Sequence, residues 1–398
     1  MKISIFGSYN GTSTGDTAIL LGLMRAIYQE HPAAEVTVLS LGPLDLSKEA
    51  QLGRYTNRPK VVRVNAWIFE ELPLLSSIVW RLQRFLPYRS ILGSINDRRC
   101  KAGLAGQDLL IIGGGNLLMD LFPGSADLIE RVCSISEKSG VPYCFLGVGA
   151  GPIAGESARA IFAKCLAGAR SVTVRDQGSL DLCRGLLKCE NAVRAPDIAF
   201  ALQNSRRTNT RRGGLAVNVA AVGDRTWPKP DEEQYRSYVA GIVRLVRAVI
   251  GECKPQRVEF VSTNGIVDDR ALDDVRLELN RLRSGDTPVA TVASCQSVTD
   301  VIEAFSRANL AITTRLHAGI LAAVAGCRVL PVAYDRKVGA VLQEERIAPH
   351  AIELADICDE EWNIRASLNL IDDLPEGPRD TIRAEAIAAV REALALSR

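Results

Sequence analysis

Residues 309–319 (NLAITTRLHAG) place two basic side chains where a predicted strand turns into a predicted helix. The apolar run before Thr313 predicts a buried strand, and Thr313 and Thr314 are candidate helix caps. Arg315 and His317 then open an alanine-rich helix, whose first N–H groups and dipole favour an anion. Two interpretations stay open: an anion site with a titratable imidazole beside it, or a structural pair bound to neighbouring carboxylates or carbonyls.

The glycine-rich loop of residues 7–16 (GSYNGTSTGD) is a second candidate site and follows a short apolar strand at residues 2–6. It leads into a predicted helix over residues 17–30, with Asp16 as the expected N-cap and Asn10 shaping the turn. The loop has neither P-loop nor GxGxxG spacing. Because first loops of α/β proteins commonly bind ligands, we expect it to face substrate; the alternative is a helix cap on a tight turn.

Two later strands, predicted at residues 109–112 and 141–148, also end in glycines. Consecutive glycines allow close backbone approach to a ligand and leave N–H groups unshielded. Ligands of parallel sheets bind at this end of the strands, although a tight turn with close helix packing is the alternative. The residues that we expect to line the site here are Gly113, Gly114, Gly115, Asn116 and Gly149.

A shorter strand over residues 171–174 ends in Arg175 and Asp176. The two side chains either pair with each other at the surface, which contributes little stability, or Arg175 reaches an anion. Asp197 follows a proline and is predicted to be a turn residue.

Strands and helices alternate through two comparable halves, which predicts two doubly wound parallel-sheet, Rossmann-like domains with a central cleft. We place an N-terminal α/β domain at residues 1–203 and a polar, basic linker at 204–213. A second α/β domain follows at 214–377. A C-terminal helix at 378–398 is expected to cross back to the first domain, by analogy with two-domain glycosyltransferases of the GT-B kind.

The composition of the chain excludes some classes of partner and site. A net charge of +2 and 5% aromatic residues argue against nucleic acid as a partner. The ten cysteines form no CxxC pair or Cys/His metal cluster, so we expect no bound metal and a reducing, cytoplasmic location. The N-terminus lacks the pattern of a signal peptide, and no apolar run is long enough for a membrane span.

Residues 72–92 are apolar with three interspersed arginines, which predicts a basic amphipathic helix. Such a helix either packs its apolar face on the domain and solvates its arginines, or lies on a membrane surface. The second interpretation allows a peripheral place at the inner membrane face and an acceptor that is lipid-linked.

In order and spacing, these motifs together resemble the polysaccharide pyruvyl transferase family over roughly residues 1–345. The most specific part is Thr-Arg-Leu-His, followed about 20 residues later by a Tyr and a Lys. The first loop is longer than the family's Asn-x-Gly-Asp. The residues that carry the resemblance are Asn10, Gly15, Asp16, Gly113–Asn116, Gly147–Pro152, Val174–Asp176, Pro196, Asp197, Thr314–Ala318 and Tyr334–Lys337.

The resemblance implies a GT-B-like fold and transfer of the enolpyruvyl unit of phosphoenolpyruvate onto two hydroxyls of a sugar. The products are a pyruvate ketal and phosphate, as in exopolysaccharide or cell-wall glycan biosynthesis. It implies that Arg315 and His317 bind and activate phosphoenolpyruvate from the second domain, with Arg175 and Lys337 as further substrate contacts. The acceptor, a sugar or oligosaccharide, lies on the side of the first domain, and the resemblance implies no cofactor beyond the donor co-substrate.

The chemistry is consistent with these residues. Arginine forks suit the carboxylate and phosphate of phosphoenolpyruvate, which makes Arg315 the main predicted anion clamp. Protonation of the methylene carbon requires an acid, for which His317 is the candidate because imidazole titrates near neutrality. Asp16 is the candidate base on the acceptor hydroxyl.

Two other functions remain open at this point. A GT-B glycosyltransferase with a nucleotide-sugar donor would share the fold and use Arg315 to hold the diphosphate. A non-catalytic sugar- or phosphate-binding relative would bind these ligands without turnover. Neither the acceptor sugar nor the oligomeric state follows from the sequence.

Overall fold

A computed structural model describes residues 1–49, 52–53, 55, 57–64, 91–121, 124–203, 213–227, 229–285, 287–369, 371, 373–375 and 380–397. Two predicted segments therefore lie outside the described residues: the linker up to residue 212, and the basic amphipathic segment up to residue 90. None of the helices in these ranges is long and apolar enough to cross a membrane.

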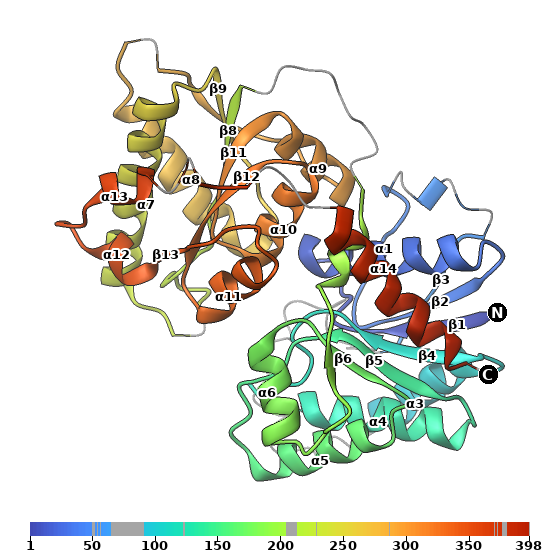
Figure 1. Ribbon diagram of the computed structural model, residues 1–398. Coiled ribbons are helices and arrows are strands. Elements are labelled where there is room, and N and C mark those ends of the chain that lie inside the picture. The colour runs from blue at the N-terminus through green and yellow to red at the C-terminus, as the bar shows by residue number, and fades with distance from the viewer. Residues whose placement is uncertain are drawn as a thin grey trace.

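The first half of the chain forms a parallel sheet in which seven strands are described (Figure 1). Apolar residues dominate its central strands because both faces of the sheet are covered by helices. In spatial order the strands are β3 (Lys60–Arg63), β2 (Glu35–Ser40), β1 (Lys2–Phe6), β4 (Leu109–Gly113), β5 (Tyr143–Val148), β6 (Val172–Val174) and β7 (Val193–Arg194).

Helices connect successive strands, as in a doubly wound fold. Helices α1 and η2 contribute to one hydrophobic cluster, and α4 and α5 contribute to another. The helical elements of this half are α1 (Thr14–Glu30), α3 (Ile91–Leu104), α4 (Ser125–Lys138), α5 (Glu156–Ala167), α6 (Gln177–Gly185) and η2 (Ile198–Ala201).

The second half repeats the design with six described strands, again all parallel. In spatial order they are β10 (Ala290–Val292), β9 (Arg257–Phe260), β8 (Gly214–Asn218), β11 (Ala308–Thr313), β12 (Arg328–Ala333) and β13 (Ile352–Glu353). The helices are α7 (Glu232–Cys253), α8 (Gly265–Arg281), α9 (Val298–Ser306), α10 (Leu316–Val324), α11 (Arg336–Glu344), α12 (Leu354–Cys358) and α13 (Ile364–Asn369).

The two halves share one continuous apolar core. Its members come from α1 and η2 on the first sheet and from β8, β11, α9 and α10 on the second. Direct contacts join α1 to α9 and α10, and η2 to α10. The last helix, α14 (Asp380–Ala395), packs against α1, η2 and β5 of the first sheet (red in Figure 1).

Two expected helix caps differ from the structure. Helix α1 starts at Thr14, and Ser13 is its N-cap, because the Ser13 hydroxyl accepts the Asp16 N–H at 3.3 Å. Asp16 therefore lies inside the first turn of α1 rather than at its cap. Helix α10 has Arg315 at its N-cap and no side-chain cap, because Thr314 uses its hydroxyl on the backbone of β8.

Candidate active site

The carboxyl ends of four strands define the site. Strand order reverses between β1 and β4 in the first sheet and between β8 and β11 in the second. Loops diverge at such a switch point and leave a crevice in which ligands of open α/β sheets bind. The loop after β1 leads to Asp16, the loop after β4 holds Gly113–Asn116, and β11 leads directly to Arg315 and His317.

His317 lies where the two halves meet, in the first turn of α10. A Cβ atom built on Gly15 of α1 would lie only 2.4 Å from its Nδ1, so the absence of a side chain there admits the ring. On the other side of the ring, Nε2 lies 3.5 Å from Asp197 Oδ2, an ion-pair distance. Nε2 is buried and has no hydrogen-bond partner among the described residues.

Asp197 links the imidazole to Arg175. It is fully buried at the N-cap of η2, and its Oδ2 accepts a hydrogen bond of 3.0 Å from Arg175 NH1. Burial opposes ionisation, but His317 and Arg175 together hold the pKa of Asp197 well below its usual range. Arg175 Nε also lies 3.9 Å from Asp176 Oδ2, an ion-pair distance, but both side chains are buried, so the pair does not lie at the surface as the first alternative had it.

Arg175 retains unused binding capacity. Its side chain is 6% exposed, and its Nε is buried without a hydrogen-bond partner in the described part of the chain. A Cβ on Gly149 would lie 3.2 Å from both Nε and NH2, so this glycine leaves room beside the guanidinium. Arg175 thus combines a fixed position with donors that are not fully used.

Asp16 joins the same group of side chains from α1. Burial raises its pKa, while the positive charges of His317 and Arg175 lower it in part. A Cβ on Gly115 would lie 3.0 Å from Asp16 Oδ1, and Gly115 has a φ of +67°, which favours glycine for a second reason. The structure therefore brings Asp16, Gly115 and His317 close together, a convergence across two sheets that the sequence had left open.

Lys337 reaches this site from α11 in the second half. Its Nζ donates to Ala150 O at 2.9 Å and to Asn116 Oδ1 at 3.3 Å, and also to Gly151 O. Asn116 in turn donates to Gly151 O at 2.8 Å. Burial lowers the pKa of Lys337, with Arg175 acting in the same direction and Asp176 opposing it.

Arg315 lies in a separate cluster within the second half. Its Nε and NH2 donate to Asp268 at 2.9 and 2.6 Å, and Asp268 is fully buried. The guanidinium carbon lies 5.7 Å from the ring centre of Trp227 and 6.0 Å from that of Tyr334. Burial works against the charged form, but Asp268 keeps the pKa of Arg315 raised. This pairing agrees with the structural alternative considered for Arg315.

Three other expected contacts have local partners. Asn10 accepts hydrogen bonds from the backbone and hydroxyl of Thr12 and so shapes the first loop. Thr314 is fully buried, and its hydroxyl oxygen accepts a hydrogen bond from the Ala220 N–H just after β8. Gly113 and Gly114 pack against Tyr9 and α1.

Sequence reasoning did not single out Asp268 or Trp227, and it took Asp197 for a turn residue. Asp197 does form the local turn, since its Oδ1 accepts Ala199 N–H at 3.0 Å. Its other oxygen meets a side chain that is 120 positions away in the chain, and no local pattern encodes that contact. Trp227 follows the loop after β8, and its spacing from Arg315 gives no sequence pattern that marks it as a partner.

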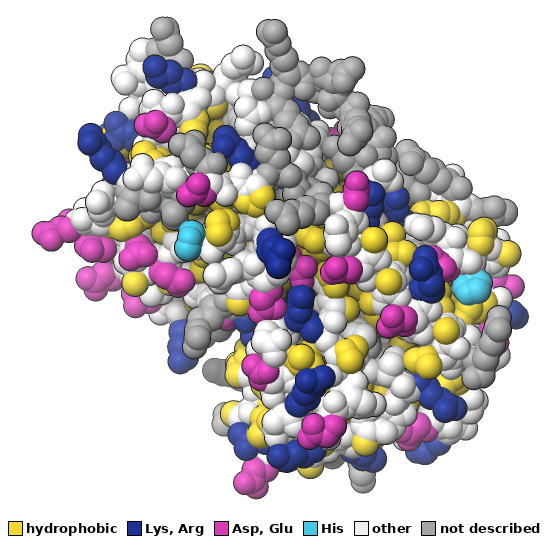
Figure 2. Space-filling model, in the orientation of Figure 1, with side chains coloured by type: hydrophobic (Ala, Val, Ile, Leu, Met, Phe, Trp, Pro, Cys, Tyr) yellow, Lys and Arg dark blue, Asp and Glu magenta, His cyan; other side chains and the backbone are white. Residues whose placement is uncertain are grey.

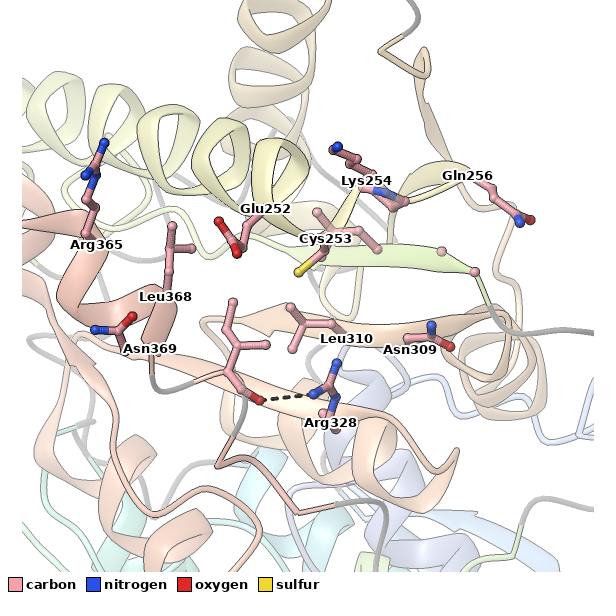
Figure 3. A pocket seen from close by; sticks show the side chains of 15 residues that line it. Glu252, Cys253, Lys254, Gln256, Asn309, Leu310, Arg328, Arg365, Leu368 and Asn369 are labelled. Carbon is pink, nitrogen blue, oxygen red and sulfur yellow. Dashed lines mark hydrogen bonds between the residues drawn. The ribbon is translucent and has the colours of Figure 1, made fainter.

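One pocket of the second half lies away from these residues. It has a volume of about 700 Å³ and lies at the amino ends of β8, β11 and β12, the opposite edge from His317. Figure 3 shows Glu252, Lys254 and Arg365 around it, and Arg328 donating to a backbone carbonyl. We place the candidate site at the strand carboxyl ends instead, because the buried ionisable groups converge there.

The face shown in Figure 2 carries exposed charges of both signs. Asp and Glu gather at its left edge, and elsewhere on this face Lys and Arg are mixed with Asp and Glu, in keeping with a net charge of +2. A ligand that binds at the interdomain site is therefore recognised by the buried groups described above rather than by a broad surface field.

Solved structures share this two-sheet architecture. The UDP-GlcNAc 2-epimerase of Methanocaldococcus jannaschii superimposes with a TM-score of 0.60 at 9% identity, covering 100% of this chain and 99% of that one. The UDP-GlcNAc 2-epimerase of Neisseria meningitidis, bound to UDP-GlcNAc, gives 0.54 at 10% identity, covering 99% and 100%. At this identity the likeness establishes the fold alone, which is GT-B-like as expected.

The sequence itself identifies the family. Residues 14–336 match the family model described as polysaccharide pyruvyl transferase. This span contains Asp16, Gly115, Arg175, Asp197, Arg315 and His317, whereas Lys337 and the loop residues before Thr14 lie outside it. The chain therefore belongs to the polysaccharide pyruvyl transferase family.

Proposed function

We propose that this transferase moves the enolpyruvyl unit of phosphoenolpyruvate onto two hydroxyls of a sugar in an exopolysaccharide or cell-wall glycan precursor. The observation that carries the proposal is a pair of buried nitrogen atoms, Arg175 Nε and His317 Nε2, without hydrogen-bond partners in the described residues. Leaving such groups unpaired is costly, so a ligand oxygen at this position is the natural partner.

The donor's two anionic groups need more than one cation. We assign one group to Arg175 and Lys337, which approach the same strand ends from the two halves. Arg315 serves the other group through NH1, since the ion pair with Asp268 uses only Nε and NH2. The N-terminus of α10 adds the backbone N–H groups that anions favour.

His317 supplies the proton in the first step. Protonation of the methylene carbon leaves an oxocarbenium-like centre that one sugar hydroxyl attacks. Phosphate then leaves with cleavage of its bond to that carbon, and the second hydroxyl closes the ketal. Of the two hydroxyl protons, one replaces the proton that went to the methyl group, and the other leaves with phosphate. A positioned imidazole contributes about 10²–10⁴-fold to such steps.

Asp16 acts on the acceptor in this scheme. Its raised pKa makes it a stronger base than an exposed aspartate, and it lies beside Gly115 at the end of β4. A carboxylate that takes the hydroxyl proton must lie within hydrogen-bond reach of the acceptor. We therefore assign the acceptor to the glycine-lined ends of β1 and β4.

The test incubates the purified protein with phosphoenolpyruvate and a panel of hexosides and lipid-linked oligosaccharides in D₂O. Expected products are phosphate and a ketal whose methyl group carries one deuterium, detected by mass spectrometry and NMR. UDP-sugars in place of phosphoenolpyruvate provide the comparison. Release of UDP with glycoside formation would assign the protein to glycosyl transfer, and tight binding of phosphoenolpyruvate with no product from any acceptor would indicate a binding protein.

A further inference from the structure

The buried carboxylate of Asp197 makes more contacts than its place in the turn requires. One oxygen, Oδ1, completes a local turn by accepting the Ala199 N–H at 3.0 Å. The other, Oδ2, lies between two side-chain nitrogens that come from different halves of the molecule, Arg175 NH1 at 3.0 Å and His317 Nε2 at 3.5 Å. A side chain with no exposed surface bears a large desolvation cost unless charged partners surround it.

We propose that Asp197 is a positioning residue that sets Arg175 and His317 at a fixed separation, and does so only when the two halves meet. The inference rests on the proposed function, in which one of these groups binds an anion and the other moves a proton. Asp197 belongs to η2 and Arg175 follows β6, both in the first half, whereas His317 belongs to α10 in the second. The proton donor is therefore completed by a residue of the opposite half.

The surroundings of the ring support this role. Gly15 closes the Nδ1 side and Asp197 faces the Nε2 side, so the imidazole is held between α1 and η2. At 3.5 Å, Asp197 attracts the ring without occupying its N–H in a hydrogen bond, which leaves Nε2 available to a ligand. Asp16 is the other carboxylate near Asp197, and Tyr9 is the nearby phenol.

The first test is a double-mutant cycle with Asp197→Asn, which keeps the size of the side chain and its oxygen for the Ala199 N–H. We expect kcat to fall about 10²-fold, the cost of a misplaced reacting group. In a His317→Gln background the same change should lower kcat by less than about threefold. The KM for phosphoenolpyruvate should still rise there, because Arg175 loses its partner in both backgrounds.

The control is Asp359→Asn, because Asp359 makes the same turn, accepting Glu361 N–H at 2.9 Å, in the second half and away from the site. It should change neither kcat nor KM. A full 10²-fold loss from Asp197→Asn in the His317→Gln background would overturn the proposal, since the carboxylate would then act independently of the imidazole.

A second measurement does not depend on pyruvyl transfer. The chain has three histidines, so ¹⁵N-labelled imidazole spectra contain three ring systems, assigned with His31→Gln, His317→Gln and His350→Gln. Asp197→Asn should move the ring signals of His317 and leave those of His31 and His350 in place. Unchanged His317 signals would reject the positioning role even if transfer is confirmed, whereas shifted signals without any transfer would reject only the proposed reaction.

Discussion

Two arginine–aspartate pairs of the molecule are built in opposite ways. Arg315 and Asp268 form two hydrogen bonds within the second half, and both oxygens of the carboxylate are used. Arg175 and Asp197 share one hydrogen bond in the first half, with His317 of the second half beside the same oxygen. The first pair is complete within one half, whereas the second leaves nitrogens unpaired and depends on both halves.

The difference indicates how much hydrogen-bonding capacity each pair keeps for a further partner. A bidentate pair to a buried carboxylate fixes the guanidinium and reduces its capacity for another anion. The shared pair keeps Arg175 Nε and His317 Nε2 without partners in the described residues, at the point where the halves meet. We infer that Arg315 contributes mainly a fixed charge, and Arg175 and His317 the adaptable contacts.

The largest expected effect comes from His317→Gln, which removes the titratable group and keeps a hydrogen-bonding side chain. We expect kcat to fall by about 10²–10⁴-fold while phosphoenolpyruvate still binds, because only the proton transfer is lost. Steady-state kinetics and calorimetric binding measure the two quantities, with the exposed His350→Gln as control. Near-normal turnover of His317→Gln would show that the Arg175–Asp197–His317 group matters no more for catalysis than the Arg315–Asp268 pair.

Asp268→Asn tests the pair that is complete within one half. The substitution leaves Arg315 without its buried counter-charge, and we expect the free energy of unfolding to fall by about 2–3 kcal/mol, because Arg315 remains partly exposed. Urea denaturation provides the measurement. Asp273→Asn on the same helix breaks only an exposed pair with Arg276 and should cost less than about 0.5 kcal/mol. Equal losses in the two variants would show that the Arg315–Asp268 pair stabilises the fold no more than the exposed Arg276–Asp273 pair does.

Gly15→Ala tests how closely the halves approach each other. The new methyl group would meet the His317 ring at 2.4 Å, so the ring must shift and kcat should fall by about 10²-fold. In α7, Gly251 has no heavy atom within 4 Å of an added Cβ, and Gly251→Ala should raise stability by about 0.5–1 kcal/mol. Full activity in the Gly15 variant would place the ring elsewhere in the working enzyme.

The smallest effect concerns Glu49, a carboxylate of the first half that accepts the Val298 N–H of α9 at 3.0 Å. Burial raises its pKa above the usual 4.5. The folded state therefore holds this proton more tightly, and the stabilisation is lost as pH rises from the unfolded pKa through the folded one. Urea unfolding at roughly pH 4 to 7 should show a shallower decline of the free energy of unfolding with pH for Glu49→Gln than for the wild-type protein. Identical pH dependence in the variant and the wild-type protein would contradict a raised pKa of Glu49 in the folded state.

Much of the fold was predictable because local patterns determine it. Apolar runs followed by glycine gave β1, β4 and β5, and parallel strands necessarily end at one edge of their sheet. That rule places Asp16 and Gly115 at one edge of the first sheet, whereas the approach of His317 from the second sheet does not follow from it. The start of α1 was misplaced because Ser13 and Asp16 are both good caps, and only the folded loop shows which hydroxyl or carboxylate is used.

The partners of the two arginines could not be predicted in the same way. Asp268 and Asp197 stand at ordinary positions, the first turn of a helix and a turn after proline, where an aspartate is explained locally. Their pairing with Arg315 and Arg175 depends on how helices pack on the sheets, and the contact of Asp197 with His317 depends on how the sheets face each other. Interactions of this kind are properties of the assembled molecule.

The return of the chain to the first sheet through α14 has a mechanical consequence. The two halves are joined by two covalent connections, one before β8 and one before α14, and α14 is anchored on α1 and η2. Because the chain crosses between the halves twice, the halves remain tethered even when their shared apolar core separates. Each half therefore stays at high effective concentration for the other. The tether favours renewed contact between His317 and Asp197 after any separation.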